Sequence, residues 1–171
     1  MKSKLHPGVK WQWRISSYVG SLFFVIFLGI WVGFAISTFT ENALQTIFLS
    51  ALFILIILII WTEIWIYLSY NRWFYEFTQD NLKIEYGVIW KTYKNVPYER
   101  VQNVDIHRGI IARVLGFSVV SIQTAGYSGG YSGRNVGYGA EGTIPAVEIN
   151  QAEKIRDFVI KKISKKSGQG F

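Results

Sequence analysis

The most constraining feature of this chain is a pair of long segments without any charged residue. Residues 15–40 form an uncharged run of 26 residues, and residues 42–62 form a second run of 21. An α-helix rises about 1.5 Å per residue and the hydrocarbon core of a bilayer is about 30 Å thick, so roughly 20 apolar residues suffice to cross it. The turn around residues 38–42 is too short to hold a domain. The sequence therefore predicts an antiparallel hairpin of two transmembrane helices, followed by a tethered soluble domain.

Charge and aromatic side chains predict how this hairpin is oriented. The segment before the first run is basic and has no acidic residue, Arg72 closely follows the second run, and the turn between the runs carries only Glu41. Aromatic residues that suit the headgroup region flank the start of the first run and the end of the second: Trp11, Trp13, Tyr18, Trp61, Trp65, Tyr67, Tyr70 and Trp73. Since basic residues favour the cytoplasmic side, we expect both termini in the cytoplasm, in a plasma or inner membrane.

The alternative interpretation of residues 1–35 is a cleaved signal peptide, because a basic start precedes an apolar stretch. The apolar run is longer than the about 7 to 15 residues of a signal peptide, and a second span follows it. These two features favour a membrane hairpin.

Length and composition leave room for one soluble domain. We expect a basic N-terminal segment at residues 1–14, the hairpin at 15–70, the domain at 71–166 and a flexible tail at 167–171. Of the net charge of +7, four positive charges precede the first run. Basic residues beside a bilayer are explained by anionic lipid and topology, and no nucleic-acid signature accompanies them. The absence of cysteine excludes disulfides and Cys-ligated metals.

The apolar pattern changes to a period of about two after residue 73, which indicates short half-buried strands. We expect strands at residues 73–78, 82–86, 88–93, 101–106, 117–124 and 143–149, whereas residues 109–115 are ambiguous and also suit a helical turn. An amphipathic helix should close the domain, with Asn150 as its N-cap and Glu153 completing a capping box.

The residues of this domain resemble a known family. The run from Val96 to Val104 (VPYERVQNV), followed by RVLGF at 113–117 and VVSIQTAG at 119–126, is similar to the bacterial membrane-flanked PH-like (pleckstrin-homology-like) family. The resemblance implies a mainly-β PH-like split barrel of about seven strands, closed by a C-terminal α-helix and joined to the two transmembrane helices. Periodicity gives six strands, so the seventh would lie in residues 109–115, in the glycine-rich segment, or be missing. Eukaryotic PH domains place basic residues for inositide binding in the loop that corresponds to residues 79–81. Here the only charged residue of that loop is Asp80.

Two groups of residues are candidates for binding. Arg100, Gln102 and Arg113, which match the family, could line a binding groove. They equally suit a structural role, in which a buried arginine pairs with Glu99 or Asp105 or caps backbone carbonyls between strands, and we favour the structural role. Arg108 lies beside His107 and Asp105, which lack the partners of a catalytic or metal site. The glycine-rich segment 126–142 carries Tyr127, Tyr131, Arg134 and Tyr138, a composition that suits either an adaptable contact loop or a simple linker.

Within the glycine-rich segment, GYGAEG at residues 137–142 matches a dinucleotide-binding string, but a strand follows it where a helix is required. In the first span, Gly29, Gly33 and Ser37 share a face that permits close helix approach. Glu63 lies just beyond the second run, and we interpret it as an interfacial, solvated acid rather than a functional one.

These features predict a non-enzymatic, membrane-anchored PH-like interaction module that binds protein or lipid at the cytoplasmic face of a bacterial membrane. The alternative is a small transport or channel component, which requires an oligomer because two helices enclose little lumen. A lipid hydrolase is disfavoured because the sequence shows no metal-ligating cluster. The predicted partners are the bilayer and another membrane or cytoplasmic protein, with a homo-oligomer as an open alternative. We predict no cofactor and no nucleic acid.

Overall fold

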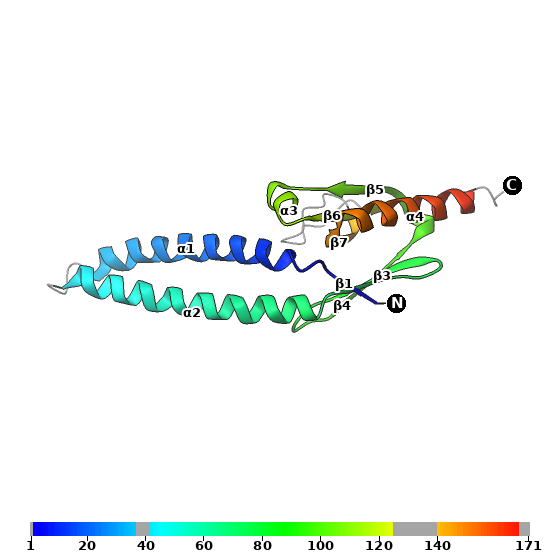
Figure 1. Cartoon of the computed structure of the whole chain (residues 1–171). Coiled ribbons are helices and arrows are strands. Elements are labelled where there is room, and N and C mark those ends of the chain that lie inside the picture. The colour runs from blue at the N-terminus through cyan, green and yellow to red at the C-terminus, as the bar shows by residue number, and fades with distance from the viewer. Residues whose placement is uncertain (1, 37–41, 125–139, 168–171) are drawn as a thin grey trace. The chain divides into compact units, whose positions relative to one another are not determined.

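The computed structural model describes residues 2–36, 42–124 and 140–167 (Figure 1). The chain divides into two compact units. One contains Lys10–Leu68, and the other combines Met1–Val9 with Ser69–Phe171. The N-terminal residues therefore belong to the same unit as the C-terminal half of the chain. The predicted division at residues 14, 70 and 166 stays a prediction.

The first unit is a hairpin of two helices, α1 (Val9–Ile36) and α2 (Ala43–Asn71). Both are long and apolar enough to cross a membrane, judged by length and composition. They run antiparallel, because Arg14 bonds to Glu63 near one end while Gly33 adjoins Ile47 near the other. Most of their large apolar side chains are exposed, as a lipid environment requires. The prediction of two apolar helices is confirmed.

The second unit begins with a four-stranded antiparallel sheet in the order β1-β2-β3-β4. Its strands are β1 (Ser3–Lys4), β2 (Phe74–Phe77), β3 (Asn81–Tyr86) and β4 (Thr92–Pro97). The alternation in β3 follows the pleat, since Leu82 and Ile84 are buried while Lys83 between them is exposed. The predicted strands at residues 73–78 and 82–86 are confirmed within a residue or two.

Two strand predictions in this sheet were wrong. Residues 88–91 form a turn instead of a strand, and β4 begins only at Thr92 and includes Pro97. The turn is set by Gly87, whose φ of 123° disfavours any other residue. The seventh strand lies neither in residues 109–115 nor in the described part of the glycine-rich segment, because it is β1, at the N-terminus.

A three-stranded antiparallel sheet follows, in the order β5-β6-β7. Its strands are β5 (Val101–His107), β6 (Phe117–Thr124) and β7 (Ala140–Glu148), and the short helices η1 (Tyr98–Arg100) and α3 (Ile110–Val114) precede β5 and β6. Residues 109–115 thus take the helical alternative. β7 begins at Ala140, so residues 140–142 belong to a strand and not to the predicted loop.

Gly142 shows how the two sheets meet. A β-carbon on Gly142 would lie 3.1 Å from Cγ2 of Val96 and 3.5 Å from Cδ1 of Ile84. The start of β7 therefore packs directly on strands of the first sheet, where a larger side chain would be crowded. This close approach explains a glycine inside a strand.

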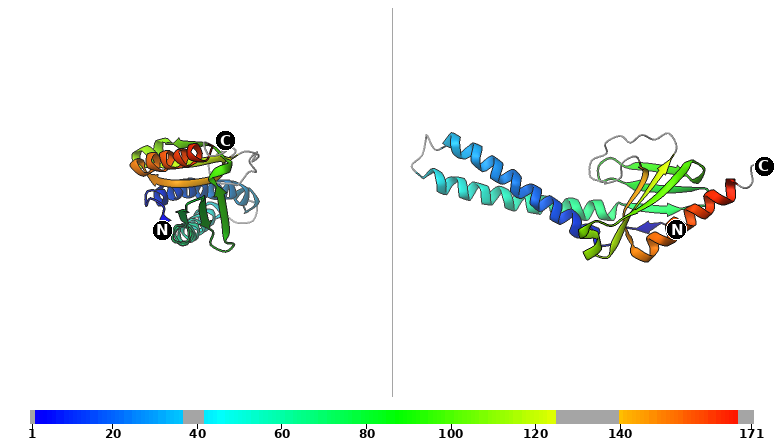
Figure 2. Two further views of the ribbon diagram at one scale, coloured as in Figure 1. Left: turned by 90° about the vertical axis from the view of Figure 1, so that its right-hand side faces the viewer. Right: turned by 90° about the horizontal axis from the view of Figure 1, so that it is seen from above.

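Helix α4 (Ile149–Ser167) packs along the second sheet (Figure 2). Its residues Ala152 and Val159 are fully buried, and the ring of Phe158 contacts the rings of Phe77 and Tyr98, with centroids 6.0 and 6.1 Å apart. The predicted C-terminal helix is confirmed. The predicted cap was wrong, because the helix already includes Ile149 and Asn150, so Asn150 lies inside its first turn.

The residues before α1 are integrated into this unit. Leu5 and Val9 are buried, the backbone N–H of His6 donates to the carbonyl oxygen of Ala146 in β7 at 3.0 Å, and the hydroxyl of Tyr70 donates to the carbonyl oxygen of Leu5 at 3.0 Å. After pairing with β2, the N-terminal segment therefore reaches the edge strand of the other sheet. Together the two sheets and α4 form the soluble domain.

Candidate interaction surfaces of the domain

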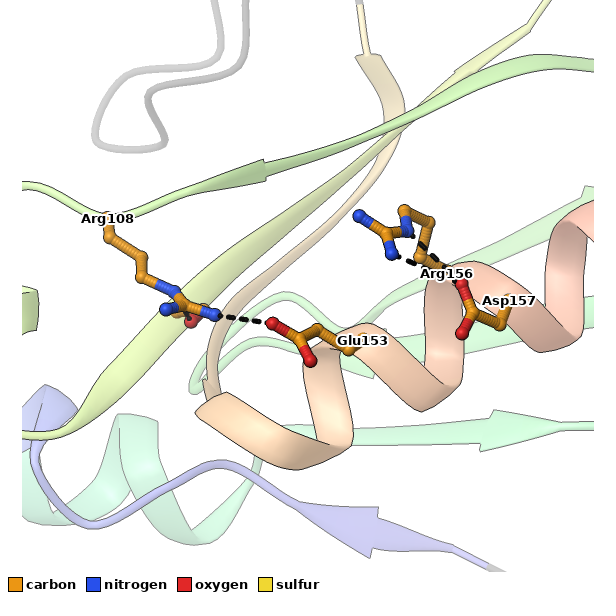
Figure 3. A network of polar contacts seen from close by, with 5 residues as sticks. Arg108, Glu153, Arg156 and Asp157 are labelled. Atoms are coloured by element: carbon orange, nitrogen blue, oxygen red, sulfur yellow. Dashed lines mark hydrogen bonds and ion pairs between the residues drawn. The ribbon is translucent and has the colours of Figure 1, made fainter.

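Arg108 has a structural position between the second sheet and α4. Its Nε donates to Oγ of the buried Ser118 at 2.8 Å, and its Nη2 lies 3.3 Å from Oε1 of Glu153 (Figure 3). These contacts join the end of β5 to β6 and to the first turns of α4. Glu153 thus pairs with Arg108 rather than completing a capping box. Two partners thus engage its guanidinium, and its role in binding stays a prediction.

The three family-matching residues have a different environment from that of Arg108. Arg100, Gln102 and Arg113 are exposed, and none of the three side chains makes a hydrogen bond or ion pair within the described part of the chain. The expected pairing of a buried arginine with Glu99 or Asp105 was therefore wrong. Arg100 lies on η1 and Arg113 on α3, so the two arginines belong to separate surfaces. Their role in binding stays a prediction.

Asp105 and His107 do not form a pair. The carboxylate of Asp105 accepts hydrogen bonds from Nδ2 of Asn103 at 2.9 Å and from Nε2 of Gln123 at 2.7 Å, while the side chain of His107 is exposed. Among the residues that the structure describes, no group of three or more His, Asp or Glu side chains could hold a metal ion. This neighbourhood therefore has a structural explanation.

Tyr127, Tyr131, Arg134 and Tyr138 lie outside the described residues. The strand ends that flank their segment are well defined, because Gln123 pairs with Ala140 and the hydroxyl of Thr124 donates to the carboxylate of Glu141. The segment at residues 125–139 thus connects two paired strands. Its part in binding stays a prediction.

A groove of about 460 Å³ lies on the first sheet and was not predicted from the sequence. It crosses β2, β3 and β4, with Lys2 just before β1 at its border. It carries charges of both signs, from Lys2, Glu76, Lys83 and Glu85 among its lining residues. Nζ of Lys2 lies 2.7 Å from Oε2 of Glu85. Such mixed charge suits the backbone and side chains of a polypeptide better than a polyphosphate headgroup. Outward-facing charges at alternate strand positions are the only sequence signal for this groove.

The Lys2–Glu85 pair changes the titration of both groups. The hydrogen bond from Lys2 lowers the pKa of Glu85, and the same bond raises the pKa of Lys2. The Lys2 ammonium also lies 5.9 Å from the ring centroid of Phe74, within cation–π range. Because the Lys2 side chain is largely exposed, solvent screens this pair, and it adds little to stability.

A polar cluster lies within the helical hairpin. Arg14 donates to both carboxylate oxygens of Glu63, at 2.7 Å from Nε and 2.6 Å from Nη2, and the hydroxyl of Tyr18 also donates to Glu63. The guanidinium of Arg14 lies 5.0 Å from the ring of Trp11. Glu63 thus connects α2 to α1, and its interpretation as an interfacial, solvated acid did not include these partners.

Comparison with known proteins gives two matches. A family model described as "Bacterial PH domain" matches residues 19–163. The UPF0699 transmembrane protein YdbT of Bacillus subtilis (strain 168) is 26% identical over 106 residues, which cover 62% of this chain and 20% of that protein. The chain thus matches about a fifth of the length of this curated relative. No solved structure shows a significant match.

Proposed function

Since this chain belongs to the bacterial PH domain family, we propose that it is a non-enzymatic interaction module, which a two-helix hairpin anchors at the cytoplasmic face of a bacterial membrane and whose PH-like domain binds protein or lipid. The family was predicted from the motifs at residues 96–104 and 113–126, and the match to residues 19–163 confirms that prediction. The same match includes most of both apolar helices, so the anchor and the domain belong to one family pattern.

The observation that carries this proposal is that both ends of the hairpin continue directly into the domain. Only two residues separate the end of α2 at Asn71 from the start of β2 at Phe74, and the second of them, Trp73, is buried and stacks on Tyr86. On the other side, Leu5 and Val9 are buried just before and at the start of α1. A domain that the chain joins to both spans remains tethered to the membrane that holds them.

The cytoplasmic orientation is supported by the four basic residues before the first uncharged run, by Arg72 after the second, and by the absence of basic residues between them. The proposal of a non-enzymatic role is supported by the side chains near Asp105 and Arg108, which are engaged in structural hydrogen bonds. The transport alternative is less favoured. Within the described hairpin, Glu63 bonds to Arg14 and Tyr18 instead of remaining free to line a pathway.

Crosslinking in native membranes tests the binding role. We expect a chain in which residues 127–139 are replaced by a tight turn to lose crosslinks to its protein partner, because Tyr, Gly and Ser residues favour adaptable contacts. The excision stops at residue 139, since Ala140 and Glu141 belong to β7. The matched control keeps the loop length and replaces Tyr127, Tyr131 and Tyr138 by Ser, which separates the tyrosine side chains from loop length.

Unchanged crosslinks in both variants would remove the loop from the binding surface. Hydrogen exchange of β6 amides should be the same in all three proteins, because closure entropy changes only slowly with loop length. Turnover of a defined substrate by the purified chain would contradict the non-enzymatic role.

A further inference from the structure

Two turns of the PH-like domain present large apolar side chains to solvent. In the turn between β3 and β4, residues 87–91, Ile89 is 68% and Trp90 is 82% exposed. In and before α3, residues 109–114, Ile110 is 77% and Val114 is 81% exposed. We refer to these segments as the Trp90 turn and the α3 turn. Neither contains an acidic residue, and each contains one basic residue, Lys91 or Arg113.

The Trp90 turn lies at the end of the first sheet that is joined to α2. The antiparallel pairs Phe74 with Glu85 and Tyr86 with Thr92 place the start of β2 beside the end of β3. The guanidinium of Arg72 donates to the carbonyl oxygen of Val88 in the turn itself. The residue that follows the last residue of α2 is therefore hydrogen-bonded to the Trp90 turn.

The α3 turn lies beside the residue that precedes α1. A β-carbon on Gly8 would lie 2.9 Å from Cδ1 of Phe117 and 3.2 Å from the carbonyl oxygen of Leu115. Leu115 directly follows α3, and α1 begins at Val9. The glycine at position 8 thus lets the chain pass close to the end of α3 as it enters the first apolar helix.

From these two relationships we propose that the Trp90 turn and the α3 turn are lipid-contacting elements, which insert their apolar side chains at the headgroup boundary of the same bilayer that holds α1 and α2. Tryptophan is enriched at this boundary, because its apolar ring and its N–H suit an interface. Arg72, Lys91 and Arg113 flank the apolar side chains with positive charge, which favours anionic phospholipids. This inference rests on the proposed membrane anchoring and adds the bilayer surface as a ligand of the domain.

The local backbone geometry of both turns directs these apolar side chains towards solvent. Gly87 adopts a φ of 123°, and a β-carbon there would lie 1.9 Å from the carbonyl oxygen of Trp90, so the backbone folds tightly back on itself and projects the residues of the tip. In α3, Ala112 is buried while Ile110 and Val114, four residues apart, share the exposed face. Exposed apolar tips beside the attachment points of two spans fit a lipid surface, which the membrane anchor itself brings within reach.

The absence of cysteine makes a direct test simple. Single-cysteine variants of the full chain, Trp90→Cys and Val114→Cys, are labelled with an environment-sensitive fluorophore and reconstituted into phosphatidylcholine vesicles with and without phosphatidylglycerol. The matched control is Lys83→Cys, an exposed position in the middle of β3. We expect blue-shifted emission at positions 90 and 114 and several-fold stronger quenching by bromolipids than at position 83, with a larger difference in the phosphatidylglycerol vesicles.

Equal bromolipid quenching at all three positions, together with equal quenching by aqueous iodide, would overturn the inference. Blue-shifted emission at positions 90 and 114 that needs an added protein fraction would also overturn it, because the turns would then bind protein instead of lipid. A Trp90→Ser variant, with the fluorophore at position 114, should lose part of the blue shift. This experiment contains only lipid and this chain, so a negative result would count against the lipid contact and not against binding of a protein partner. Conversely, a loss of crosslinks to a protein partner would not count against the lipid contact.

Discussion

The backbone N–H of His6 donates to the carbonyl oxygen of Ala146 at 3.0 Å, although 140 positions of sequence separate the two residues. Residues 3–9 thereby form part of the PH-like domain before the chain enters α1. The hairpin is consequently an insertion between β1 and β2, two paired strands of one sheet. The basic N-terminal segment therefore contributes to the fold of the domain.

The first prediction concerns Leu5, which is 3% exposed. We expect Leu5→Ala to destabilise the domain by about 2–5 kcal/mol, because a buried leucine loses its transfer free energy and leaves a cavity. Hydrogen exchange of β6 and β7 amides in detergent measures this loss. The control Ile110→Ala removes an exposed side chain and should change protection by less than about 0.5 kcal/mol. Equal protection in both variants would mean that the N-terminal segment is not part of the folded unit.

Gly142 allows a second prediction. We expect Gly142→Leu to destabilise the domain by about 1–3 kcal/mol, since the new side chain would collide with Val96 and Ile84 where β7 meets the first sheet. A β-carbon on Gly109 would meet no atom within 4 Å, so Gly109→Leu is the control and should unfold at nearly the wild-type temperature. Thermal unfolding followed by near-ultraviolet circular dichroism distinguishes them. A fully stable Gly142→Leu protein would contradict the packing described for β7.

Parts of this fold were predictable because single elements carry a strong local signal. The alternation of β3, the buried run of β6 and the helical spacing of Ala152 and Val159 each point to one structure. β1 contains only two residues, so it has no detectable period, and its pairing with β2 depends on residues about 70 positions away. The apolar residues at 88–90 have the composition of a strand, but the positive φ of Gly87 turns the chain there.

The candidate site was less predictable than the fold. Family resemblance selected Arg100, Gln102 and Arg113, and its place beside His107 and Asp105 selected Arg108. Neither signal could distinguish the bonded Arg108 from the exposed arginines, because burial depends on how β5, β6 and α4 pack. The groove across β2, β3 and β4 was missed for the same reason, since it requires the N-terminal Lys2 beside Glu85. The environment of Arg108 and the groove both depend on contacts between residues far apart in the sequence. The periodicity of a single sequence does not reveal such contacts.

The helical hairpin supplies a third prediction. Gly33→Ile should lower the thermal stability of the hairpin more than Gly20→Ile does, because a β-carbon on Gly33 would lie 3.3 Å from Cδ1 of Ile47 whereas one on Gly20 would meet nothing within 4 Å. The expected cost of the crowded variant is about 1–3 kcal/mol. The two variants are compared by thermal unfolding in detergent and by the size of their oligomers. Identical behaviour would show that the small-residue face does not contribute to helix packing.

Tyr98 leads to a fourth prediction, on pH dependence. Burial raises the pKa of Tyr98 to about 12, from an ordinary value of 10.0. A pKa that is raised on folding contributes stability that is present below about pH 10 and is lost as the pH rises towards 12. The free energy of unfolding of Tyr98→Phe should therefore fall less steeply with rising pH in this range than that of the wild type. Tyr75, whose pKa burial also raises, accounts for part of the remaining dependence.

At neutral pH, Tyr98→Phe should cost only about 0.5–1.5 kcal/mol, the contribution of one hydrogen bond, here from its hydroxyl to the carbonyl oxygen of Thr78 at 3.3 Å. Denaturant unfolding of both proteins from pH 7 to 12 provides the curves. Parallel curves for the variant and the wild type would exclude Tyr98 as a source of alkaline instability.

The central claim, a PH-like module anchored at the cytoplasmic face, is tested most directly by cysteine accessibility in intact cells. Asn42→Cys lies in the turn between the two spans, and Ser167→Cys lies at the end of α4. The account predicts that a membrane-impermeant reagent labels Asn42→Cys from outside, whereas Ser167→Cys reacts only after the cells are permeabilised. Labelling of Ser167→Cys in intact cells, with Asn42→Cys protected, would reverse the topology and contradict the account.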